Sequence, residues 1–294
     1  MKSSKRHLGI AVGVASVLAI ACGVALDNRG RDATMSALAD EPVPAASPAK
    51  NTGRTPGAAF LMDLSKGHDP DTQYLSNYDL HAGWTEAVFR EDNIKFGGNG
   101  MTLHAEREQA GKLKYTSAEF QKTGFYGYGR YEVVMRSSNA VGVVSSFFTH
   151  TDGYFGDPHD EIDFEFIGRV PRSIHTNIFH DDGGNSVDIP LWFDPSAGEH
   201  LYAFEWSPDA VRWYVDNVKI REVTRASSKA GLPTASSRVM SSLWASYGES
   251  EKWVGAARFS HAQAFYRCMS HVPMGEQAPQ CSDTFKPPKA PPKH

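Results

Sequence analysis

The residues best suited to chemistry are three acids that alternate with large apolar residues in the stretch 160–166, which reads DEIDFEF. Successive side chains of a β-strand leave on opposite faces, so Glu161, Asp163 and Glu165 share one face and the intervening apolar residues share the other. Three adjacent carboxylates repel one another and are costly to remove from water. We therefore expect the apolar face to enter a core and the acidic face to serve a reaction.

Cleavage of a glycosidic bond needs such a set, because one carboxylate attacks the sugar and a second carboxyl protonates the leaving oxygen. At about 3.3 Å per residue, the Cα atoms of Glu161 and Glu165 lie about 13 Å apart in a strand. Side chains that lean inward bring the carboxyl groups to about 5–6 Å, near the separation in retaining glycosidases. Asp163 between them can share a proton with a neighbour and separate the pKa values of the outer pair. The alternative is a solvated strand face without chemistry.

The stretch 160–168, DEIDFEFIG, resembles the signature of glycoside hydrolase family 16 in its regular Glu-x-Asp-x-Glu form. This form is similar to that of the bacterial lichenases and the plant xyloglucan endotransglycosylases. The resemblance runs over about 60–273 and is strongest from residue 115 onward. It implies that Glu161 is the nucleophile, that Glu165 is the general acid and then base, and that Asp163 tunes their charges. It implies no organic cofactor; a structural calcium on the face away from the groove occurs among relatives but is not required for the chemistry.

The resemblance also implies a groove in which five further residues hold sugars, namely Glu119, Phe148, His159, Asn177 and Trp244. Aromatic rings bind the flat C–H faces of sugars, and polar side chains bind their hydroxyl groups. Asn177 is expected near Glu165. Gln121 stands where lichenases carry an arginine, so we expect no bidentate cationic contact there. His150 stands where lichenases usually carry a tyrosine. These replacements leave the polymer and its linkage open.

We predict a retaining, endo-acting glycoside hydrolase that cleaves a 1,3-1,4-β-glucan-like polymer or a related bacterial polysaccharide. A xyloglucan-type endotransglycosylase would use the same covalent intermediate. His159, the run 175–177 and Ser242 resemble the transglycosylases, whereas 117–120 and 145–148 resemble the hydrolysing lichenases. A non-catalytic carbohydrate-binding protein is the other alternative, but a binder has no need of three adjacent carboxyls.

Short β-rich runs separated by Gly, Asn and Asp predict an all-β fold, a jelly-roll sandwich of two antiparallel sheets with an open substrate groove. The expected strands are 101–107, 115–122, 129–136, 142–149, 160–167, 173–179, 200–207, 210–215, 218–224 and 239–244. Asp216-Asn217 is typical of a two-residue hairpin turn. A single short helix is expected near Leu232.

The 294 residues divide into one working domain and its flanking segments. Residues 1–26 carry early lysines and an apolar run over 8–26, which predicts a signal peptide or a membrane anchor, and hence an exported protein that is secreted, periplasmic or attached to the membrane. Cleavage, retention and lipidation at Cys22 stay open. Residues 27–57 have the composition of a disordered linker. Residues 58–285 form the catalytic domain, and 286–294 a tail rich in Pro and Lys.

Cys268 and Cys281 are the only cysteines outside the export segment. In an oxidising compartment we expect them to form a disulfide that ties the last strand to the tail.

The expected partner is a polysaccharide. A formal net charge of −4 without a basic cluster argues against nucleic acid as a partner. We expect a monomer. His159, His175 and His180 with Asp181 form no ligand set of known spacing, so we expect no metal in the reaction.

Overall fold

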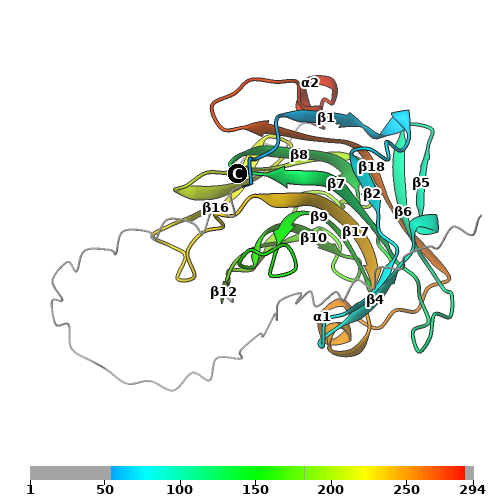
Figure 1. Ribbon diagram of the computed structural model, residues 1–294. Coiled ribbons are helices and arrows are strands. Elements are labelled where there is room, and N and C mark those ends of the chain that lie inside the picture. The colour runs from blue at the N-terminus through cyan, green and yellow to red at the C-terminus, as the bar shows by residue number, and fades with distance from the viewer. Residues whose placement is uncertain (1–53, 182, 289–294) are drawn as a thin grey trace, which may run out of the picture.

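The computed structural model describes residues 54–181 and 183–288. The predicted export segment at 1–26, most of the linker and the end of the tail lie outside the described residues. Two eight-stranded antiparallel sheets pack face to face, which confirms the predicted all-β sandwich (Figure 1). We call them the outer and the inner sheet, because β18 and β6 lie on the outer side of the bent strands and β10 and β9 on the inner side (Figure 1).

The outer sheet has the order β16-β15-β14-β8-β18-β6-β5, with β1 also paired to β18. Its strands are β1 Phe60–Asp63, β5 Ile94–Gly97, β6 Gly100–Glu106, β8 Gly129–Arg136, β14 His200–Trp206, β15 Ala210–Val215, β16 Val218–Thr224 and β18 His261–Pro273. The inner sheet has the order β12-β11-β10-β9-β17-β7-β2, with β13 also paired to β11. Its strands are β2 Gln73–Leu75, β7 Ala118–Tyr126, β9 Val143–Thr151, β10 Asp160–Ile167, β11 Ser173–His180, β12 Gly183–Gly184, β13 Val187–Pro190 and β17 Ser237–Ala245.

A small two-stranded sheet and a few single turns of helix complete the described fold. They are β3 Tyr78–His81, β4 Glu86–Phe89, α1 Glu251–Val254, α2 Cys281–Thr284, and the 3₁₀ turns Leu64–Lys66, Glu91–Asn93 and Gly248–Ser250. No helix in the described part of the chain reaches the length of a membrane span.

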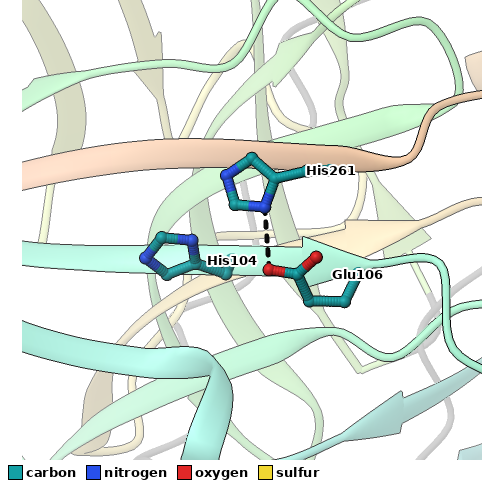
Figure 2. Close-up of side chains that lie close together, drawn as sticks. All are labelled: His104, Glu106 and His261. Atoms are coloured by element: carbon teal, nitrogen blue, oxygen red, sulfur yellow. Dashed lines mark hydrogen bonds and ion pairs between the residues drawn. The ribbon is translucent and has the colours of Figure 1, made fainter.

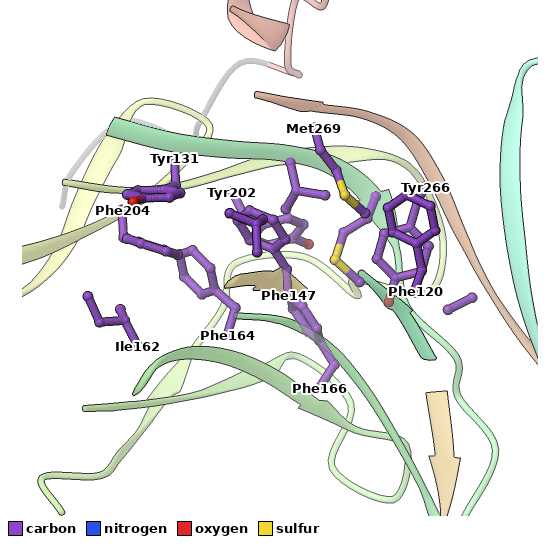
Figure 3. Close-up of a cluster of buried hydrophobic side chains, with 14 of the residues drawn as sticks. Phe120, Tyr131, Phe147, Ile162, Phe164, Phe166, Tyr202, Phe204, Tyr266 and Met269 are labelled. Atoms are coloured by element: carbon purple, nitrogen blue, oxygen red, sulfur yellow. The ribbon is translucent and has the colours of Figure 1, made fainter. Parts of the chain in front are cut away.

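The main core lies between the two sheets and takes the apolar face of β10. Ile162, Phe164 and Phe166 are at most 2% exposed and point toward the outer sheet (Figure 3). The rings of Phe164 and Phe166 lie 5.8 and 4.8 Å from the ring of Tyr202 on β14. Burying one such phenylalanine contributes about 1.5–3 kcal/mol. This face of β10 therefore fixes its register, because a slip by one residue would bring the acids into the core.

All ten predicted strands are present, four of them with the predicted bounds. The hairpin turn between β15 and β16 is also confirmed, since Asp216 and Asn217 have φ values of 49° and 66°, as a type I′ turn requires. The helix expected near Leu232 was wrong: residues 225–236 contain turns and coil, and Leu232 itself is buried in the core.

The longest strand, β18, was not among the predicted ones. Its buried positions include two alanines, a cysteine and a histidine, so the apolar alternation that marks a buried strand is weak there. Its central place in the outer sheet comes from pairing with β8, β6 and β1, which lie far away in the sequence.

Contacts at the two ends of the domain show which residues pack on it. Residues 54–57 were assigned to the linker, but Arg54 forms an ion pair with Asp157 at 2.8 Å and the Gly57 amide donates to the carbonyl of Phe125 at 2.7 Å. Residues 54–57 therefore pack against the domain. At the other end, Cys268 on β18 and Cys281 on α2 form the predicted disulfide. It holds the segment after β18 against the outer sheet.

Candidate active site

The three acids of β10 lie in the middle of the inner sheet, on the face that points away from the core. The strand register places a specific pair of neighbours beside each acid. Glu161 lies between His150 of β9 and Phe179 of β11, Asp163 between Phe148 and Asn177, and Glu165 between Ser146 and His175. Because cross-strand partners share a face, these six side chains surround the acids.

Glu161 is the most strongly engaged of the three acids. His150 Nδ1 and His159 Nε2 each lie 2.8 Å from the same carboxylate oxygen, Oε2. Burial alone would raise the pKa of Glu161, but the two hydrogen bonds and the attraction of the histidines outweigh burial and lower this pKa well below the ordinary value of a glutamate. Glu161 therefore stays ionised at neutral pH, as a nucleophile must.

His150 is held in its charged form by the acids around it. Burial disfavours that form, but hydrogen bonds to Asp152 and Glu161 raise the pKa of His150 to about 10. The His150 side chain thus links two carboxylates, with Nδ1 2.8 Å from Glu161 and Nε2 3.5 Å from Asp152.

The pKa values of Asp163 and Glu165 shift upward, in the opposite direction from the pKa of Glu161. Burial, followed by the negative charges of Glu161 and Glu165, raises the pKa of Asp163 well above its ordinary value. Burial, the charge of Glu161 and the charge of Asp188 raise the pKa of Glu165 to about 8. Within the described structure no hydrogen-bond partner holds the Glu165 carboxyl, so it is free to give its proton to a leaving group.

Solvent reaches the three acids of the acidic face unevenly. Glu161 and Asp163 are only 7% and 2% exposed, while Glu165 is partly exposed. Beyond Glu165, a small pocket is lined in part by His175, Asp188 and Trp253.

Glu119 lies on the same face of the inner sheet, on β7, and is 5% exposed. Its Oε1 accepts hydrogen bonds from Ser76 at 2.7 Å, Gln121 at 2.8 Å and Tyr78 at 3.0 Å. Three donors on one oxygen hold this carboxylate in place, so Glu119 also positions the segment that carries Ser76 and Tyr78.

Phe148, Asn177 and His159 lie around Glu161 and Asp163. Phe148 points to the acidic face, whereas its neighbour Phe147 is fully buried in the core. Asn177 lies directly opposite Asp163 rather than Glu165, and its Oδ1 accepts from the Asn185 amide at 2.9 Å. The His159 ring stacks on Phe179 with 5.0 Å between ring centroids.

Trp244 does not offer the open stacking face that was expected. It is 4% exposed and belongs to a second apolar cluster beneath the β3–β4 sheet. Trp84 and Trp253 lie against it, with ring centroids 5.9 and 6.4 Å away. Both of these rings are more exposed than Trp244, because they form the outer layer of the cluster.

Sequence reasoning missed two residues of the acidic face. The first is His150, which was noted only as a replacement; the alternation that places Phe148 on this face also places His150 there. The second is Arg238 on β17, whose Nη1 donates to Gln121 Oε1 at 2.7 Å. The guanidinium group absent at position 121 is therefore supplied from the neighbouring strand.

Histidine and acid clusters on this face include one group able to bind a metal ion. His150, His159 and Glu161 place their ligand atoms within 4.8 Å of one another. His175 and His180 are not part of it, since they pair with Asp188 and Asp160 at 2.7 and 2.6 Å. The hydrogen bonds of His150 and His159 to Glu161 account for the close approach of these three side chains without a metal.

Comparison with known proteins gives consistent matches. Residues 81–262 match the family model described as glycosyl hydrolases family 16. The chain is 35% identical to a beta-glucanase of Acetivibrio thermocellus over 235 residues, which are 76% of this chain and 67% of that protein. It is also 35% identical to a beta-glucanase of Paenibacillus macerans over 201 residues, 68% of this chain and 81% of that protein.

Solved structures agree with these matches. The crystal structure of a prokaryotic beta-1,3-1,4-glucanase (lichenase) from a mouse hindgut metagenome superposes with a TM-score of 0.69 and 27% identity, covering 74% of this chain and all of that chain.

Proposed function

The chain belongs to glycosyl hydrolase family 16, and on this premise we propose that it is an endo-acting β-glucanase that cleaves with retention of configuration. One observation carries the mechanism: three carboxyls share one face of β10, and their surroundings push the pKa of Glu161 down and the pKa of Glu165 up. A nucleophile and a general acid need these opposite shifts.

In the first step the ionised Glu161 attacks the anomeric carbon and forms a covalent glycosyl-enzyme, while Glu165 gives its proton to the leaving oxygen. In the second step Glu165, now a carboxylate, takes a proton from water, and the oxygen of that water displaces Glu161. Asp163 is held protonated beside Glu161 and can donate to it. His150 and His159 keep Glu161 ionised before the attack. Neither step needs a metal or an organic cofactor; a structural calcium on the outer face stays a prediction.

The relatives suggest the substrate class. Two of them are named as beta-glucanases and a structural neighbour as a beta-1,3-1,4-glucanase. We therefore propose a mixed-linkage β-glucan, or a bacterial polysaccharide of related backbone, as the polymer. The replacements at Gln121 and His150 lie on the substrate-facing side of the inner sheet, so the preferred linkage has to be measured with a panel of polysaccharides.

The test measures reducing ends released from such a panel and the anomer that forms first. Retention predicts that the β-anomer appears first in NMR spectra. Glu161→Ala should lose turnover, and azide should rescue it with formation of an α-glycosyl azide, because the small anion enters the space of the lost carboxylate. Glu165→Ala with an activated aryl glycoside should instead give a β-glycosyl azide, because its nucleophile is intact.

Glu222→Gln is the matched control, since Glu222 lies on β16 of the outer sheet and pairs with Arg212 and Lys219. It should behave like the unaltered chain. An α-anomer as first product, or unchanged turnover in Glu161→Ala, contradicts the assigned roles. Product lengthening with an added oligosaccharide acceptor, without release of reducing ends, would identify a transglycosylase instead.

We also propose that the protein is exported and acts as a monomer, with residues 8–26 as signal or anchor. The disulfide between Cys268 and Cys281 supports export, because such bonds persist in oxidising compartments. Mass analysis of the native N-terminus would show whether the segment is cleaved, retained or lipidated at Cys22. Light scattering of the purified chain tests the monomer.

A further inference from the structure

A second cluster of histidine and acid lies on the solvent face of the outer sheet, on the far side of the sandwich from the three acids. His104 and Glu106 come from β6 and His261 is the first residue of β18 (Figure 2). Along β6, buried residues alternate with partly exposed ones, and both His104 and Glu106 fall on the partly exposed side. The strand period of two therefore points them in the same direction.

The register of β6 and β18 brings the third residue to them. His261 is the direct cross-strand partner of Glu106, and its Nδ1 lies 2.7 Å from Glu106 Oε1. The rings of His104 and His261 lie 5.0 Å apart between centroids. One ligand atom from each of the three residues falls within 4.8 Å of the others. Figure 2 shows the Glu106 carboxylate next to the rings of His104 and His261.

The ring of His104 is also oriented by a neighbour. Its Nε2 lies 2.8 Å from Thr102 Oγ1 on the same strand. A hydrogen bond from Nε2–H to this hydroxyl leaves the lone pair on Nδ1. Histidines that bind metals characteristically donate their other ring N–H in this way, which fixes the tautomer and the ring orientation.

From this geometry we propose that His104, Glu106 and His261 form a binding site for a divalent transition metal, with zinc as its preferred ion. Two imidazoles and one carboxylate are a donor set that suits zinc, which binds nitrogen at about 2.0–2.1 Å and carboxylate oxygen at about 2.0–2.2 Å. Ligand atoms already within 4.8 Å of one another need only small side-chain rotations to reach such a sphere. The fourth position faces solvent and takes water.

The bound ion would join β6 to the start of β18. The disulfide of Cys268 with Cys281 crosslinks the same strand further along, so the ion would anchor the other part of β18. The site has no part in glycoside cleavage. Its loss should leave glucanase activity unchanged in the absence of zinc.

The experiment titrates zinc chloride into the full purified chain after removal of metals with a chelator, and follows binding by calorimetry. One equivalent should bind to this site. The affinity should fall by more than about 100-fold in His104→Ala and in His261→Ala, since even the loss of an outer hydrogen-bond partner costs about 10–100-fold. Thr102→Val should show that smaller loss. Cobalt in place of zinc should give the visible absorption of a four-coordinate site.

His81→Ala is the matched control, because His81 Nδ1 lies 2.9 Å from Glu86 in a similar exposed cross-strand pair. There Lys112 at 2.6 Å from Glu86 takes the place of a second histidine, so this variant should bind zinc normally. Zinc should raise the thermal midpoint of the unaltered chain and of His81→Ala, but not of the double variant His104→Ala/His261→Ala. Glucanase activity confirms that each variant is folded.

The proposal is overturned if the unaltered chain binds no zinc at millimolar concentration. It is equally overturned if the double variant binds as many equivalents as the unaltered chain. If zinc binding is lost only in His150→Phe and zinc inhibits cleavage, the ion binds at His150, His159 and Glu161 instead, and the proposal is overturned as well.

Discussion

The contact between His150 and Glu161 gives the sharpest test of how this site sets the charge of its nucleophile. His150→Phe keeps a ring of similar size but removes one of the two hydrogen bonds, at 2.8 Å, to the same buried oxygen. A hydrogen bond to a charged group contributes about 1.5–3 kcal/mol. At 1.36 kcal/mol per pKa unit, the pKa of Glu161 should rise by about 1–2 units.

Cleavage needs Glu161 ionised, so activity is lost as the pH falls through its pKa. The acidic limb of kcat/KM should therefore move upward by about 1–2 pH units in His150→Phe. The alkaline limb should stay, because it follows the pKa of Glu165 near 8, below the pKa of His150 near 10. His150→Gln keeps a neutral donor and should move the acidic limb by less.

The assay measures initial rates on soluble β-glucan from the lowest pH that the folded chain tolerates up to pH 10, with each sample returned to neutral pH to verify that it has not unfolded. An acidic limb that stays in place while the rate falls at every pH would refute the reasoning, because His150 would then act on geometry and not on the charge of Glu161. Equal shifts in His150→Phe and His150→Gln would also refute it, since the donor would be irrelevant.

Three further outcomes follow from the same structure. Glu165 must be protonated to act, so kcat/KM of the unaltered chain should decline as the pH rises through about 8. Glu165→Gln should lower the rate on β-glucan by about 10²–10⁴-fold, but much less on an aryl glycoside with a good leaving group. Equal losses on both substrates would contradict the role of Glu165 as the acid. Cys268→Ser should lower the free energy of unfolding by about 3 kcal/mol, as expected for a loop of this length, measured by urea unfolding against the chemically reduced chain as control. Trp244→Ala should cost about 3–5 kcal/mol because the ring is buried; unchanged stability with a raised KM would mean instead that Trp244 contacts sugar.

Much of the fold could be predicted because its signal is local. In β10, polar and apolar residues alternate with the period of a strand, and this alone places Glu161, Asp163 and Glu165 on one face and their apolar neighbours in the core. The turn at Asp216-Asn217 was equally readable, because few residues adopt the two positive φ values that it needs.

Elements whose signal is not local were missed or misjudged. The strand β18 carries little apolar alternation and owes its place to partners 125 or more residues earlier in the chain. The sequence does not show whether the side chain of Trp244 contacts sugar or is buried. It is buried because Trp84 and Trp253 pack over it in the second apolar cluster.

The sequence by itself thus determined which groups can react and on which side of a strand they emerge, because the direction of a side chain follows from the pleat of its own strand. The tertiary structure alone decided their charges and companions. His150 and Arg238 reach the acidic face from other segments, and His261 meets His104 and Glu106 only through the pairing of β18 with β6. A pKa or a ligand set depends on distances across the fold, and those exist only once the strands have paired.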